Sequence, residues 1–288
     1  MRRDYVTMAI AAIAIIIAGV SLVKVQNTNT VQNSKVDTLE KIKQTGELSA
    51  CYVPFATSII KDPDTGKLSG HSVEAIEYIA NQINAKVNYV ESTWGNIVAD
   101  VASGRCDMSL YYFNLVPRAY TLAFTESLNF EGTTALVKTS DSRFNNVKDV
   151  MDFDKAEYTV VVANGEAGHI FVKDNFKKAK IEVIDVEAGD ALGFLTAVST
   201  GRADVGIVSA EGGNDFNKKH PELRNVFAKN PFSLNPIGYA VRQDDLKFLN
   251  FLNNSLSMME VKGLTRQFEK KYDAKVIYKQ EQFITSEQ

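Results

Sequence analysis

The chain has 288 residues, of which 45% are hydrophobic and 23% are charged, and its net charge is −3 at pH 7. This composition is typical of a folded protein with one large domain or two smaller ones. The balance of charge excludes a basic nucleic-acid-binding surface, and three His and two Cys are too few and too scattered for a zinc site, so we expect no cofactor.

The first segment in chain order is apolar. Arg2 and Arg3 precede an uncharged apolar run from Val6 to Val23. The run is longer than the roughly 7–15 apolar residues of a signal peptide and close to the roughly 20 of a membrane span. We therefore predict an uncleaved signal anchor with the rest of the chain outside the cytoplasm, and a cleaved signal peptide is the alternative. With a polar linker, this segment covers residues 1–38.

Helical and strand patterns then alternate. The first set of predicted helices covers 38–46, 71–85 and 96–104, and the predicted strands cover 48–53, 86–92 and 106–112. Ser72 is the predicted N-cap of the second helix. Cys51 and Cys106 lie in two of these strands and could form a disulfide in an oxidising compartment. We favour two buried free thiols, because cysteine is often buried as a small hydrophobic residue.

A second set of elements follows. Its predicted strands cover 158–164, 181–186 and 203–209, and its predicted helices cover 168–178, 190–201 and 211–223. The sequence Gly-Arg-x-Asp separates a helix from a strand at 104–107 and again at 201–204. This repetition predicts two α/β lobes of similar build, with a ligand cleft at the carboxyl ends of their strands.

Six motifs occur in a characteristic order: LEKIKQTGEL, DPDTGKLSGHSVEAIEYIANQI, VESTWGNIVADVASGRCDMSL, VPRAYTLAFTESL, VSTGRADVGIVS and GYAVRQDD…EVKGLTRQFEKKY. Together they resemble the family 3 extracellular solute-binding proteins of amino-acid-type ABC importers, over residues 39–272. The resemblance implies a two-lobed periplasmic-binding-protein-like (type II) α/β fold, with two crossover hinge strands that let the lobes close on ligand. Lobe 1 would cover 39–131 and 238–280, lobe 2 would cover 132–237, and 281–288 would form a tail.

The same resemblance implies a function. It describes an extracytoplasmic, monomeric binding protein, not an enzyme, that captures a small polar organic solute such as an amino acid. Its partners would be an ABC permease and ATPase, and its N-terminal helix would hold it at the membrane. One alternative is a periplasmic dehydratase of the cyclohexadienyl type, with Glu166 as the added acid. Another is a membrane-tethered ligand-sensing domain.

Two residues match the family's main ligand contacts in lobe 1. Arg118 matches the arginine that clamps the ligand carboxylate, and a planar guanidinium suits that role because it makes two parallel hydrogen bonds. One residue is missing before Arg118, relative to the family motif. Trp94 matches the aromatic residue that packs over the ligand. A surface arginine and a core tryptophan are the alternative interpretations.

Four further residues lie near the ends of predicted strands in lobe 1. Tyr111 and Tyr112 should point to opposite sides of their strand, because successive side chains alternate. We therefore favour Tyr112 and Asn114 as ligand contacts over Tyr111. Tyr52 ends the first strand, and it either lines the cleft or lies at its rim.

The expected contacts from lobe 2 are Gly165, Glu166 and Ser209. Gly165 and Glu166 occupy a strand-to-helix turn whose N–H groups favour anions, so Glu166 either caps them or faces the ligand. Ser209 stands where the family commonly has an Asp that binds the ligand's ammonium group, and Glu211 is the alternative carboxylate. Loss of that contact would cost about 1.5–3 kcal/mol. We therefore predict a pocket that is not built for a standard amino acid.

Overall fold

The computed structural model describes residues 37–274. The predicted signal anchor and the predicted tail lie outside the described residues. Among the helices of residues 37–274, none combines the length and the apolar character that crossing a membrane requires.

One mixed sheet forms the centre of the described part, in the strand order β4-β1-β5-β12-β7-β10-β8-β9, with β6 beside β12 and β11 beside β7. The strands are β1 (Glu47–Tyr52), β4 (Lys86–Glu91), β5 (Met108–Phe113), β6 (Leu122–Phe124), β7 (Asn129–Lys138), β8 (Thr159–Ala163), β9 (Lys180–Ile184), β10 (Val205–Ser209), β11 (Leu223–Asn225) and β12 (Phe232–Arg242). A separate hairpin pairs β2 (Ile60–Lys61) with β3 (Leu68–Ser69).

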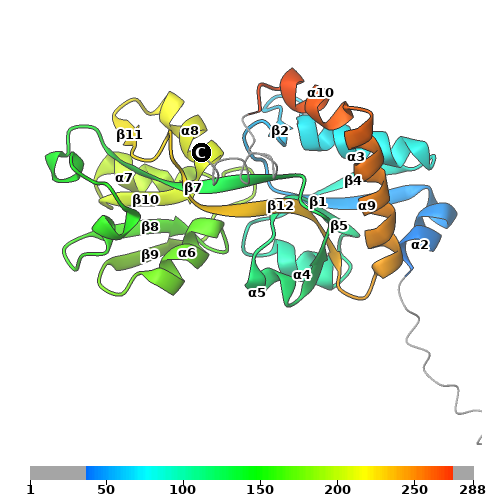
Figure 1. Ribbon diagram of the computed structural model, residues 1–288, viewed down its shortest axis with the longest axis horizontal. Helices are drawn as coiled ribbons and strands as arrows, with labels where there is room; N and C mark the ends of the chain where they lie inside the picture. Colours follow the sequence, from blue (N-terminus) through cyan, green and yellow to red (C-terminus); the bar gives the residue numbers. More distant parts are fainter. Residues whose placement is uncertain (1–36, 275–288) are drawn as a thin grey trace, which may run out of the picture. The chain divides into compact units, whose positions relative to one another are not determined.

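The sheet has two parallel halves joined by antiparallel strands. Strand β1 pairs in parallel with β4 and β5, and β8 pairs in parallel with β9 and β10. The long strands β7 and β12 run antiparallel to each other between these halves (Figure 1). We call the half built on β1, β4 and β5 lobe 1, and the half built on β8, β9 and β10 lobe 2. This arrangement confirms the predicted two-lobed type II fold with two crossover strands, while the exact lobe boundaries stay predictions.

Helices cover both faces of each lobe (Figure 1). Lobe 1 carries α2 (Thr38–Thr45), α3 (His71–Gln82), α4 (Ile97–Ala102), α5 (Val116–Ala119), α9 (Leu246–Val261) and α10 (Leu264–Lys271). Lobe 2 carries α6 (Ala167–Asn175), α7 (Thr196–Thr200), α8 (Ala210–Lys219) and the short 3₁₀ segments η1 (Ser142–Phe144), η2 (Val150–Phe153) and η3 (Gly193–Leu195). The return of α9 and α10 to lobe 1 agrees with the prediction that the C-terminal part is not a third domain.

Two local predictions were wrong. Helix α3 begins at His71 with Gly70 as its N-cap, so Ser72 lies inside the helix and does not cap it. A side chain at position 70 would come within 2.3 Å of the Ser58 carbonyl oxygen, which explains why glycine starts this helix. The predicted helix at 190–201 is shorter and divides into η3 and α7.

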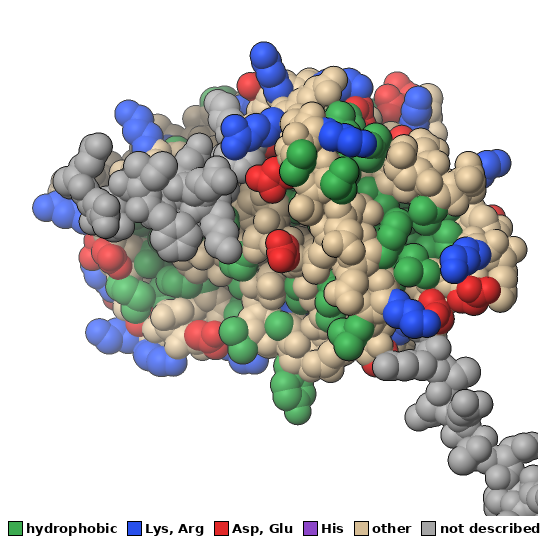
Figure 2. All heavy atoms as spheres, turned by 45° about the vertical axis from the view of Figure 1, so that its right-hand side comes forward, with side chains coloured by type: hydrophobic (Ala, Val, Ile, Leu, Met, Phe, Trp, Pro, Cys, Tyr) green, Lys and Arg blue, Asp and Glu red, His purple; other side chains and the backbone are tan. Residues whose placement is uncertain are grey.

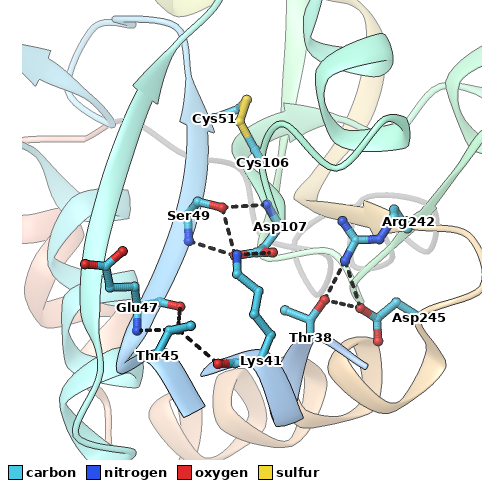
Figure 3. Close-up of polar contacts among 10 residues, drawn as sticks. All are labelled: Thr38, Lys41, Thr45, Glu47, Ser49, Cys51, Cys106, Asp107, Arg242 and Asp245. Carbon is cyan, nitrogen blue, oxygen red and sulfur yellow. Dashed lines mark hydrogen bonds and ion pairs between the residues drawn. A yellow bond between two sulfur atoms is a disulfide. The ribbon is translucent and has the colours of Figure 1, made fainter. Parts of the chain in front are cut away.

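The cysteine prediction was also wrong, because Cys51 and Cys106 form a disulfide between β1 and the segment that enters β5 (Figure 3). Directly beyond Cys106, the buried Asp107 carboxylate accepts hydrogen bonds from the Lys41 ammonium at 2.7 and 2.9 Å. It also accepts hydrogen bonds from the backbone N–H and the hydroxyl of Ser49. The disulfide and this polar cluster fasten α2, β1 and β5 together.

A second polar cluster joins the two ends of lobe 1. The Arg242 guanidinium at the end of β12 donates to the Thr38 hydroxyl at 2.6 Å, and Thr38 donates to the Asp245 carboxylate (Figure 3). Asp245 is also the N-cap of α9. Residues more than 200 positions apart are therefore held side by side in the interior.

The outer surface carries both signs of charge. Figure 2 shows Lys and Arg side chains interspersed with Asp and Glu over the face that is drawn. Neither sign dominates that face, so the surface charge does not indicate a binding site there.

Candidate functional site

Arg118 lies where the chain leaves β5 and enters the short helix α5. Its side chain is only 4% exposed although it carries a charge. Nη1 donates to the Phe113 carbonyl at 2.9 Å, and Nη2 donates to the Gly165 carbonyl of lobe 2 at 2.5 Å. A guanidinium has five N–H donors, so these two bonds leave further donors for an anion. Burial lowers the pKa of Arg118, while the neighbouring Glu166 carboxylate opposes this shift.

Two aromatic rings of lobe 1 support the guanidinium. Its carbon lies 3.8 Å from the centre of the Tyr112 ring, in a cation–π contact. The Trp94 ring stacks nearly parallel to Tyr112 with 6.2 Å between centroids, and the Tyr112 hydroxyl donates to the Trp94 carbonyl. Phe55 packs edge-on against Trp94. Arg118, Tyr112 and Trp94 therefore form one stack, which fixes the guanidinium in place.

A bulge in β5 separates the two tyrosines. Between Gly238 and Ala240, β12 changes register against β5, and Tyr111 adopts φ of +39°, a conformation that side-chain-bearing residues rarely adopt. Tyr111 then packs against Phe55 and His71 and donates to the Asn129 side chain. The two tyrosine side chains have different surroundings, and Tyr112 is the one that contacts Arg118.

The turn before α6 in lobe 2 lies directly against lobe 1. Gly165 has φ of +76°, and a β-carbon there would lie 2.7 Å from both the Trp94 carbonyl oxygen and the Gly95 α-carbon. In the other direction, a β-carbon at Gly95 would make only ordinary contacts with Asn164. The two lobes therefore meet backbone to backbone at Gly165.

Glu166 caps helix α6 from inside the protein. It is 3% exposed, and its Oε2 accepts from the Gly168 N–H at 2.6 Å. Its Oε1 accepts from the Ser209 N–H at 3.1 Å, which connects the starts of α6 and α8. Burial raises the pKa of Glu166 to about 7, against the opposing effects of these hydrogen bonds and of Arg118. Glu166 was expected either to cap the helix or to face the ligand, and in the structure it caps the helix. The positive charge of Arg118 also acts to lower the pKa of Glu166, against the effect of burial.

Six of the nine predicted site residues lie together: Trp94, Tyr112, Arg118, Gly165, Glu166 and Ser209. Tyr111 lies at the bulge in β5, and its side chain contacts Phe55 and His71. The Tyr52 hydroxyl donates to Glu91, and burial, followed by the Glu91 charge, raises the pKa of Tyr52 to about 12. Asn114 is half-buried at the end of β5, where its backbone N–H donates to the Pro236 carbonyl.

One buried acid at this site was missed. Glu131 on β7 is 7% exposed, and its Oε1 accepts from the Glu211 N–H at 2.9 Å. The available signal was an acidic residue inside a strand that otherwise reads as buried, since such a residue needs a partner or a function. Across residues 37–274, no group of three or more His, Cys, Asp or Glu side chains is arranged to hold a metal ion.

The chain is similar to known proteins in sequence and in fold. The family model of the bacterial extracellular solute-binding proteins, family 3, matches residues 48–275. A cyclohexadienyl dehydratase of Pseudomonas aeruginosa is 25% identical, over 80% of this chain and 83% of its own. A probable amino-acid ABC transporter-binding protein of Haemophilus influenzae is also 25% identical, over 75% and 79%. The crystal structure of an ancestral amino acid-binding protein, AncCDT-1, has a TM-score of 0.72 at 24% identity and covers 82% of this chain and 99% of its own.

Proposed function

Because the chain belongs to the bacterial extracellular solute-binding proteins, family 3, we propose that it captures a small polar organic solute by hinge closure. The solute is an amino acid or a related compound, and the complex is delivered to the permease and ATPase of an ABC importer. A tether through the apolar segment 6–23 is part of this proposal. The disulfide supports an extracytoplasmic location, because disulfides persist in oxidising compartments.

The contact of Arg118 with both lobes carries this proposal. Its guanidinium is held on the Tyr112 ring of lobe 1 and donates to the Gly165 carbonyl of lobe 2. A buried, fixed guanidinium with donors to spare suits a carboxylate, which it can bind through two parallel hydrogen bonds. A carboxylate bound there would contact lobe 1 first and favour closure of lobe 2 over it.

Replacement of Arg118 tests the proposal. We expect isothermal titration against a panel of amino acids and organic acids to find a carboxylate-bearing ligand. Arg118→Ala should weaken its binding about 10–100-fold, because a hydrogen bond to a charged group contributes roughly 1.5–3 kcal/mol. Arg118→Lys should recover only part of the loss, since an ammonium cannot make the paired contact.

Arg105→Ala is the matched control. Arg105 is half-exposed and pairs with Asp100 outside the site, so its removal should leave ligand affinity unchanged. If no member of the panel bound at millimolar concentration, or if Arg118→Ala bound the best ligand as tightly as the natural protein, the proposal would be wrong.

A dehydratase is the second candidate, and Glu166 favours it. A buried carboxyl with a pKa of about 7 is half-protonated near neutral pH and suits a general acid. The cyclohexadienyl dehydratase among the relatives gives the substrate to try. We expect any turnover of prephenate or arogenate to be abolished in Glu166→Gln, as followed by product absorbance. Turnover that survives this substitution would exclude Glu166 as the acid, and no turnover by the natural protein would exclude the candidate.

A further inference from the structure

A buried glutamate and a half-buried one lie together beside the site, at the junction of β7 and α8. Glu131 Oε1 accepts from the backbone N–H of Glu211 at 2.9 Å. The Glu211 carboxylate in turn accepts from the hydroxyl and the backbone N–H of Thr57 in lobe 1. Glu131 Oε2 is buried and has no hydrogen-bond partner within residues 37–274. A buried carboxylate oxygen without a partner is costly, so this atom indicates that a partner is supplied from elsewhere.

The pair carries more negative charge than its surroundings balance. Within the described part of the chain, no Lys, Arg or His side chain forms an ion pair with either carboxylate. Burial raises the pKa of both groups, and the Glu211 charge raises that of Glu131 further. The other charged or titratable groups that act on the pair or line the cavity beside it are Tyr111, Glu166, Asp215, Lys218, Lys219, Lys229, Tyr272 and Asp273.

The pair is also accessible from solvent. Both glutamates line an open cavity of about 990 Å³ whose wall includes Thr57 of lobe 1 and Ala210 of lobe 2. Ser209, which carries no charge, lies close enough to Glu131 to favour its ionised form. Thus the position where the family's ammonium-binding Asp was expected holds a serine, and a strand between the lobes supplies the carboxylate beside it.

We propose that Glu131 and Glu211 bind a cationic nitrogen of the ligand, a primary ammonium or a guanidinium, between the lobes. This inference rests on the proposed binding function and names the chemistry of one end of the ligand. The nitrogen would give Glu131 Oε2 its partner and offset one of the two negative charges of the ionised pair. Glu131 belongs to a crossover strand and Glu211 to lobe 2. Binding there would therefore also favour the closed arrangement, in which Thr57 of lobe 1 donates hydrogen bonds to Glu211.

Proton release accompanies this binding. Without ligand, burial and the neighbouring Glu211 charge favour a protonated Glu131 carboxyl. When the cationic nitrogen binds, Glu131 ionises and its proton leaves to solvent, and no bond of the ligand is made or broken. Protons therefore compete with the ligand, and affinity for a cationic ligand should rise as pH rises through the range in which the pair titrates.

Three probes test the proposal: L-lysine with two ammonium groups, L-norleucine with one, and hexanoate with none. Glu131→Gln keeps an acceptor for the Glu211 N–H but removes the charge. We expect it to weaken binding of at least one ammonium-bearing probe about 10–100-fold and to leave hexanoate unchanged. Titration at one pH in phosphate and in Tris buffer should show proton release by the natural protein, and none by Glu131→Gln.

Glu222→Gln is the matched control, because Glu222 is exposed, pairs with His220 and lies outside the cavity. It should change neither affinity nor proton release. If Glu131→Gln bound every ammonium-bearing probe like the natural protein, or if it weakened hexanoate binding as much as ammonium binding, the inference would be overturned. The proposed binding function would not be affected by that result. If the natural protein bound none of the three probes and nothing in the wider panel, the proposed function and this inference would fail together.

Discussion

Loss of the Cys51–Cys106 disulfide is expected to lower the free energy of unfolding by about 4 kcal/mol. The two cysteines are separated by 55 residues in sequence, and a crosslink over a loop of that length restricts the unfolded chain by about this amount. The loop that the disulfide closes contains α3, β4 and Trp94. When the disulfide is reduced, nothing holds residues 51 and 106 together in the unfolded chain. Urea unfolding of the oxidised protein and of protein reduced while unfolded measures the difference.

A double variant with alanine at both positions is the control. Both cysteines are fully buried, and alanine keeps a small apolar side chain at each site. The variant should unfold like the reduced protein, and reductant should change it no further. If oxidised and reduced natural protein unfolded at the same urea concentration, or if thiol titration in urea without reductant found two free thiols, the disulfide would be excluded.

The fold could be predicted from the sequence because its strands carry a strong local signal. Strands such as 158–164 and 203–209 are short, buried and apolar, and they recur with helices between them as parallel α/β lobes require. The errors arose where tertiary contacts decide the outcome. Gly70 starts α3 because the Ser58 backbone leaves no room for a side chain, and a contact with a preceding loop has no signal in the helix sequence itself.

The site was predictable only in part, for a related reason. Arg118 and Trp94 stand within recognisable motifs and Gly165 stands in a strand-to-helix turn, and the structure places them together. An acidic residue inside an apolar strand marked Glu131 as unusual, but its hydrogen-bond partner, the N–H of Glu211, is 80 residues away in sequence and has no local signal. The bulge in β5 is likewise a property of two strands and not of one. Contacts between residues far apart in sequence therefore determine where Glu131 and Glu211 lie in this site.

Gly165→Ala is expected to prevent full closure of the lobes and to weaken ligand binding about 5–150-fold. An added β-carbon would lie 2.7 Å from backbone atoms of Trp94 and Gly95 across the interface, and neither backbone can turn away as a side chain can. Such overpacking costs about 1–3 kcal/mol, and this penalty applies only to the closed form. It is therefore subtracted directly from the free energy of ligand binding.

Two further variants separate this clash from the strain of a left-handed backbone. Gly66→Ala imposes the same kind of strain, at φ of +69°, but meets no atom within 4 Å. Gly95→Ala adds a β-carbon on the other side of the interface, where it makes only ordinary contacts. Both should bind ligand like the natural protein, and small-angle scattering should show them compacting when ligand is added, whereas Gly165→Ala should not compact. Equal affinity and compaction in all three would mean that ligand binding does not bring Gly165 against Gly95.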